Sequence, residues 1–216
     1  MDRANISIYR GSQTLAICGA IAPIVLIGAI IIGALVTPGY NHLSDPVSQL
    51  ASQDRLHPGF MMVGFIVYGI LMIALGYELS RSLGFAREAK KVLILFVVHG
   101  VGFIIGGFLR DDPMVSPNVL TFRGILHNIS FIIGCLALVF GIIVFAKAVS
   151  RIREWRIFAN FSLIIVSITL GVFFISQLPV LTSIDGLLQR IYGILPLIWV
   201  ESTSIIYLAR ASDNLS

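Results

Sequence analysis

The sequence predicts an all-α membrane protein in which six helices cross the bilayer and both termini lie in the cytoplasm. The first observation is composition, because 57% of the 216 residues are hydrophobic and only 12% are charged. Soluble domains carry about 25% charged residues. The second observation is length, since six apolar stretches each approach the roughly 20 residues that a helix needs to cross the hydrocarbon core. The third is that the charges lie almost entirely between these stretches.

The six predicted spans follow one another with short gaps. They cover residues 14–36, 59–77, 91–108, 124–146, 157–178 and 186–208. None has the period-2 alternation that marks a membrane barrel. Helices satisfy their own backbone hydrogen bonds in lipid, so the continuous apolar runs favour helices. The first span is longer than the apolar core of a signal peptide, so we expect it to stay as the first helix. We expect residues 1–216 to form a single membrane domain.

The Lys and Arg residues predict the orientation. Eleven of the fifteen lie in or beside the N-terminal segment, the second and fourth gaps and the C-terminal segment, and four lie in or beside the other gaps. The positive-inside rule then places both termini in the cytoplasm of a cell-membrane protein. The first, third and fifth gaps lie on the outer face. The same excess accounts for the net charge of +4, so no nucleic-acid partner is needed to explain it.

Small residues predict where the helices approach closely. Gly102 and Gly106 form a GxxxG pair in the third span, and Ser130 with Gly134 repeats this spacing in the fourth. Such pairs let two helix backbones touch. We therefore expect the third and fourth spans to be packed through these faces.

Four side chains with reactive or ionisable groups lie inside the spans. Cys18 and Cys135 differ in depth, so we expect two packed free thiols and no disulfide. His99 lies about 12–16 Å from the flanking charges at 1.5 Å per residue, and Glu201 has a similar depth. Ionisable groups at mid-membrane usually face the bundle interior with a partner. We predict that His99 and Glu201 face inward and pair, directly or through water, as a proton route. The alternative is a histidine satisfied by a backbone carbonyl and a protonated glutamate.

The first outer gap contains a helix-start pattern. Ser44 precedes Asp45 and Pro46, in the order of an N-cap, a first-turn acid and an early proline. A short helix from this point would place Asp45, Ser48 and Gln49 on one side. The alternative is an interfacial helix whose polar side is simply solvated.

Other outer segments add polar residues, and all of them converge on one mouth if the helices pack as one bundle. The candidate ligand-binding residues are Ser44, Asp45, Ser48, His57, Arg110, Asp111, Asp112, His127, Asn128 and Arg190. Guanidinium groups suit phosphate and carboxylate, so Arg190, Arg110 and also Arg123 are predicted to hold an anionic group. A metal site would use His57, His127 and Asp112, although no paired spacing such as HxxxH or CxxC fixes it. No cofactor motif is present.

Several of these segments resemble domain-of-unknown-function family 998, which comprises small six-helix membrane proteins of prokaryotes. The segments are Leu43-Ser44-Asp45-Pro46-Val47-Ser48-Gln49-Leu50, residues 106–113, Leu126-His127-Asn128 and Gly186-Leu187-Leu188-Gln189-Arg190, together with Trp199. The resemblance covers nearly the whole chain. It implies a six-helix bundle with polar motifs on one side, and it implies no activity.

Three functions are consistent with these features. The first is binding or transport of a small polar molecule or lipid head group in an outer-face pocket of the bilayer-embedded protein. The second is a metal-dependent lipid hydrolase within the membrane, which would use His57, His127 and an aspartate as ligands and another carboxylate as general base. The third is a structural or assembly subunit whose outer motifs bind another membrane protein.

Overall fold

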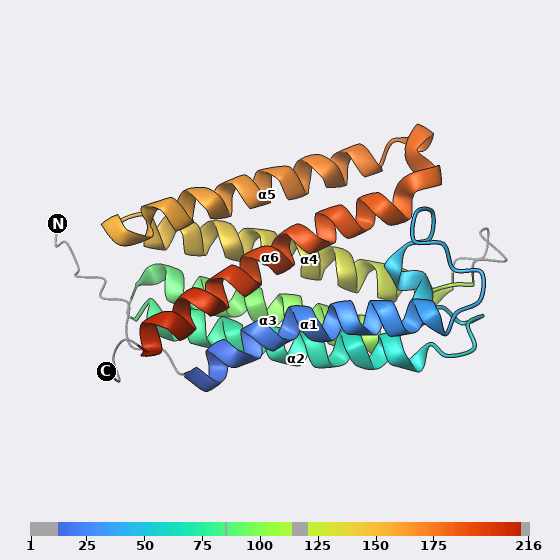
Figure 1. Cartoon of the computed structure of the whole chain (residues 1–216), viewed down its shortest axis with the longest axis horizontal. Coiled ribbons are helices and arrows are strands. Elements are labelled where there is room, and N and C mark those ends of the chain that lie inside the picture. The colour runs from blue at the N-terminus through green and yellow to red at the C-terminus, as the bar shows by residue number, and fades with distance from the viewer. Residues whose placement is uncertain (1–12, 85, 114–120, 213–216) are drawn as a thin grey trace.

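The structure is a computed structural model that describes residues 13–84, 86–113 and 121–212 (Figure 1). It confirms six long helices, each apolar enough to cross a membrane, and those residue ranges contain no strand. The helices are α1 (Gln13–Leu35), α2 (Gly59–Ser82), α3 (Arg87–Phe108), α4 (Phe122–Val149), α5 (Arg156–Ser176) and α6 (Asp185–Ser212). Three short 3-10 helices lie in the connections: η1 (Val47–Ala51), η2 (Arg153–Trp155) and η3 (Pro179–Ile184).

The helices form a ring in chain order. Each helix packs against the next one along the chain, and α6 returns to pack against α1. The start of α1 and the end of α6 lie at one end of the bundle, which we call the proximal end (left in Figure 1). The connections α1–α2, α3–α4 and α5–α6 lie at the opposite, distal end. The distal end is the face that the charge bias predicts to be outside the cell.

Glycines bring α2, α3 and α4 into backbone contact. A Cβ placed on Gly69 of α2 would clash with the carbonyl oxygen of Gly100 on α3, and the reverse also holds. A Cβ placed on Gly102 would lie 2.6 Å from the carbonyl oxygen of Ser130 and 3.1 Å from Cα of Gly134. The close approach predicted for the third and fourth spans is therefore confirmed, and α2 joins it through a pair that the spacing did not reveal.

Aromatic side chains fill the middle of the ring. Trp199 of α6 is fully buried. Its ring centroid lies 6.2 Å from that of Phe96 on α3, 5.8 Å from that of Phe145 on α4 and 6.1 Å from that of Phe158 on α5. Its indole nitrogen donates a hydrogen bond to the Ser162 hydroxyl at 2.7 Å, so the polar end of the ring is also satisfied. One side chain thus joins four helices of the ring.

Gly102→Ala is expected to destabilise the protein by about 2 kcal/mol, because the new methyl group would push against backbone atoms that cannot rotate away. Gly171→Ala on α5 is the matched control, since a Cβ there would meet no atom within 4 Å. That variant should be stabilised by up to about 1 kcal/mol through helix propensity. Unfolding by sodium dodecyl sulfate in mixed micelles measures both changes. Equal effects at the two positions would contradict the backbone contact.

Candidate functional site

The α1–α2 connection is held against α6 by Arg190. Its Nη1 donates to the carbonyl oxygens of His42 at 2.9 Å, Asp45 at 3.1 Å and Gly186 at 2.6 Å. Its Nη2 donates to the Tyr40 hydroxyl. The planar guanidinium carries five donors in a fixed arrangement, which suits several acceptors at once. The group that the sequence predicted to hold an anionic ligand is therefore occupied by carbonyl and hydroxyl oxygens of the protein itself.

Tyr40 completes this contact. The Arg190 guanidinium lies 5.6 Å from the centroid of the Tyr40 ring, and the hydroxyl lies 3.2 Å from the carbonyl oxygen of Asp45 and 3.1 Å from that of Pro46. Burial raises the pKa of the Tyr40 hydroxyl above its ordinary value, and the charge of Arg190 acts in the opposite direction. The hydroxyl stays protonated at neutral pH, and it can donate to these carbonyls while it accepts from Arg190.

The predicted helix start at Ser44 is wrong. The Ser44 hydroxyl donates to Oδ1 of Asp45 at 2.8 Å, and Oδ2 of Asp45 accepts the backbone N–H of Asn41 at 3.0 Å. Both side chains therefore stabilise the turn before the helix. The element that follows is the 3-10 helix η1, which has Pro46 at its N-cap position and no side-chain cap. Ser48 lies half-buried within η1.

Asp112 organises the start of α4. Its carboxylate accepts the Thr121 backbone N–H at 3.0 Å and the Thr121 hydroxyl. The same hydroxyl oxygen accepts the N–H of Gly124 at 3.1 Å, so Thr121 is the N-cap of α4. A carboxylate beside a helix N-terminus is also favoured by the helix dipole. Asp112 thus has a structural role in the first turn of α4.

His127 joins the start of α4 to the end of α3. Its Nδ1 lies 2.7 Å from the carbonyl oxygen of Leu109 and 3.1 Å from that of Gly106. Carbonyl oxygens only accept, so Nδ1 carries the hydrogen and satisfies acceptors at the end of α3. The buried Nε2 has no hydrogen-bond partner among the described residues and lies 3.9 Å from Oδ2 of Asp111.

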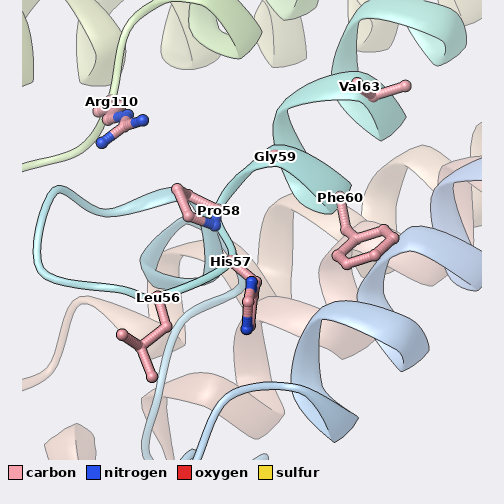
Figure 2. Close-up of a pocket in the computed structure, with 7 residues that line it drawn as sticks. All are labelled: Leu56, His57, Pro58, Gly59, Phe60, Val63 and Arg110. Atoms are coloured by element: carbon pink, nitrogen blue, oxygen red, sulfur yellow. The ribbon is translucent and has the colours of Figure 1, made fainter.

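A groove opens beside the start of α2, and Figure 2 shows the residues around it. Its volume is about 560 Å³, and its lining is Leu56, His57, Pro58, Gly59, Phe60, Val63 and Arg110. We call it the distal groove. Arg110 comes from the α3–α4 connection, and the other lining residues belong to α2 or the segment just before it. His57 and Arg110 are exposed, and no hydrogen bond or ion pair joins Arg110 to another residue in the described ranges.

The predicted metal ligands do not come together. His57 lines the distal groove, His127 is bonded to α3, and Asp112 is bonded to Thr121. Within residues 13–84, 86–113 and 121–212, no group of three or more His, Cys, Asp or Glu side chains could hold a metal ion.

The structure does not join His99 to Glu201. Nδ1 of His99 donates to the carbonyl oxygen of Gly134 at 2.9 Å, and Nε2 lies 3.0 Å from the Tyr68 hydroxyl, which donates to it. Both ring nitrogens are satisfied. His99 therefore fits the alternative given above, a histidine that is hydrogen-bonded to a backbone carbonyl. Glu201 is half-buried on α6, and its buried Oε2 has no hydrogen-bond partner among the described residues.

Glu78 is a buried ionisable residue that the predicted spans leave out. The second span was predicted to end at Tyr77, but α2 continues to Ser82 and buries Glu78 completely. Glu78 interacts electrostatically with Tyr207 of α6, whose hydroxyl is hydrogen-bonded to that of Ser82. The signal was its position three residues after Leu75 and four before Ser82, which continues the buried stripe of the helix. This polar contact lies at the proximal end.

The model of a family described as "Protein of unknown function (DUF998)" matches residues 20–204. The chain belongs to this family. The match confirms the resemblance carried by the motifs. No curated protein and no solved structure matches the chain. In this DUF998 protein the motifs contact one another in pairs. Segment 43–50 contacts residues 186–190 of α6, and segment 106–113 contacts His127.

Arg190→Ala is expected to release the α1–α2 connection from α6. Loss of charge-assisted hydrogen bonds worth about 1.5–3 kcal/mol corresponds to amide exchange about 10- to 100-fold faster at residues 40–45. Hydrogen–deuterium exchange followed by mass spectrometry measures the exchange rate at these residues. Arg110→Ala is the control at the same end of the bundle and should leave exchange at residues 40–45 unchanged. Unchanged exchange in Arg190→Ala would contradict the role assigned to this side chain.

Proposed function

We propose that the protein binds the anionic head group of a membrane phospholipid in the distal groove. The observation that carries the proposal is the exposure of Arg110 and its lack of a partner among the described residues. Its guanidinium is exposed at the edge of the groove and has no ion-pair or hydrogen-bond partner in the described part of the chain. Arg190, by contrast, is occupied by the α1–α2 connection.

The lining of the groove suits a lipid. A guanidinium can form two parallel hydrogen bonds to a phosphate, and such charge-assisted pairs are stronger than neutral ones. The exposed His57 adds a second hydrogen-bonding group. Phe60 and Val63 are 50% and 59% exposed on the first turns of α2, where they can contact the upper part of an acyl chain. The groove is wide open to its surroundings, so it suits a head group that keeps part of its contact with water.

The distribution of Lys and Arg among the connections predicts on which side of the membrane the groove lies. With both termini in the cytoplasm, the distal groove lies at the level of the outer-leaflet head groups. Arg123 is exposed in the first turn of α4 but does not line the groove. Arg123 therefore contributes to the electrostatic potential near the groove and does not contact the bound head group.

The hydrolase alternative is not favoured by the arrangement of the candidate residues. Its ligands would be His57, His127 and an aspartate, and these lie in separate contacts. The general base would be a second carboxylate, but Asp112 already accepts two hydrogen bonds from Thr121. The assembly-subunit alternative stays a prediction, because no contact in the described residues supports it over lipid binding.

Arg110→Ala is expected to lower the affinity for phosphatidylglycerol by about tenfold or more, because it removes a charge-assisted contact of about 1.5–3 kcal/mol. Titration of the purified protein with phosphatidylglycerol, followed by thermal shift or native mass spectrometry, measures the affinity. Arg123→Ala is the matched control and should stay close to the parent protein.

Phosphatidylcholine provides the second comparison, because its head group carries no net charge. It should bind more weakly than phosphatidylglycerol and should be insensitive to Arg110→Ala. The proposal is wrong if the two lipids bind equally well, or if Arg110→Ala and Arg123→Ala lower the affinity to the same extent.

A further inference from the structure

One side of α4 is packed near the proximal end and uncovered near the distal end. Asn128, Cys135 and Ile142 are seven residues apart, so two turns of helix bring each onto the same side. Ile142 is completely buried, and Ala146 one turn further on is 1% exposed. Cys135 and Asn128 are exposed. The prediction of a packed thiol at Cys135 is therefore wrong, because the helix face that carries it loses its cover in the distal half.

The facing side of α6 shows the same change. Gly193, Val200 and Tyr207 are also seven residues apart and share one side of the helix. Val200 and Tyr207 are buried. Gly193 is exposed, and a Cβ placed on it would meet no atom within 4 Å. The inward side of α6 thus also faces open space in its distal half.

The two uncovered sides come near each other at Cys135 of α4 and Tyr192 of α6, the residue before Gly193. The Cys135 thiol interacts electrostatically with the hydroxyls of Tyr68 on α2 and Tyr192 on α6. It therefore lies between three helices. Leu136 is 44% exposed on another side of α4, as expected for a side chain that contacts acyl chains.

We infer that a water-accessible cleft lies between the distal halves of α4 and α6 and binds a small, uncharged, hydrogen-bonding molecule. Its walls carry the Asn128 amide and the Cys135 thiol on one side and the Tyr192 hydroxyl on the other. Trp199 and Ile142, both fully buried, form its floor. Amides and hydroxyls offer both donors and acceptors without net charge, which suits alcohols and amides.

The mouth of the cleft lies next to η1. The side chain of Gln189 interacts with the Tyr192 hydroxyl, and its Oε1 accepts the backbone N–H of Val47 at the start of η1. Asp185, at the first residue of α6, interacts electrostatically with Tyr192. None of these residues lines the distal groove. The cleft and the lipid site are therefore separate, and either can fail without the other.

Thiol labelling tests the access of water to the cleft. The chain has two cysteines, so Cys18→Ala leaves Cys135 as the sole thiol. In membranes opened to both sides, a methanethiosulfonate with a trimethylammonium group should modify Cys135, because this charged reagent travels through water and not through hydrocarbon. N-ethylmaleimide, which partitions into lipid, serves as the reference reagent.

A matched control lies one residue further along α4. Leu136→Cys, made in a background with Cys18→Ala and Cys135→Ala, places the thiol on the lipid-facing side at nearly the same depth. The charged reagent should modify it at least about tenfold more slowly than Cys135, since hydrocarbon excludes the reagent. Modification of Cys135 by N-ethylmaleimide alone, or equal rates with the charged reagent at the two positions, would overturn the inference.

Two further measurements test the size of the cleft and its ligand class. Gly193→Leu should fill the open space and slow labelling of Cys135, whereas Gly171→Leu on α5, also in open space, should not. Glycerol, erythritol and acetamide are the probes for occupancy. At least one should slow labelling of Cys135 severalfold, and Asn128→Ala should remove this protection. An unchanged rate in Gly193→Leu would refute the cleft, and no protection by any of the three probes would refute the ligand class.

Discussion

Backbone carbonyl and N–H groups at the distal end need hydrogen-bond partners, and polar side chains of the protein supply many of them. The ends of helices leave such groups without a partner inside the helix, and the connections lie at these ends. Arg190 donates to three carbonyl oxygens, His127 contacts two, and Asp112 accepts both donors of Thr121. The side chains that look most like an active site in the sequence thus do much of the work of holding the connections together.

The contrast between Arg110 and Arg190 follows from the same constraint. The two side chains have the same chemistry, and both lie at the distal end. Arg190 faces carbonyl oxygens of a turn that packs against α6, so its two terminal nitrogens donate hydrogen bonds within the fold. Arg110 lies at the edge of a groove whose other walls are mostly apolar. Among the described residues Arg110 has no hydrogen-bond or ion-pair partner, and it lies next to exposed apolar side chains. This makes it a better ligand-binding candidate than Arg190, whose terminal nitrogens already donate to the protein.

The sequence predicts those features that depend on local pattern and misses those that depend on the arrangement of the helices. The six spans follow from apolar length, and the contact at Gly102 follows from the spacing of small residues. The helix start at Ser44 fails because the conformation of residues 40–51 depends on contacts with Arg190 and Gly186, which lie far away in the chain. Cys135 was expected to be packed because one sequence does not reveal where along α4 its inward side loses its cover.

Closure of the ring has a consequence for biosynthesis. Because the chain emerges N-terminal end first, α2 to α5 can each dock on a neighbour that already exists. The α1–α2 connection differs, since its hydrogen bonds with Arg190 span up to 150 positions of sequence. That connection cannot reach its final shape until the sixth helix has been made and inserted. The first connection to be synthesised is thus among the last to mature, and in a truncated nascent chain it would stay without these hydrogen bonds and open to proteases and chaperones.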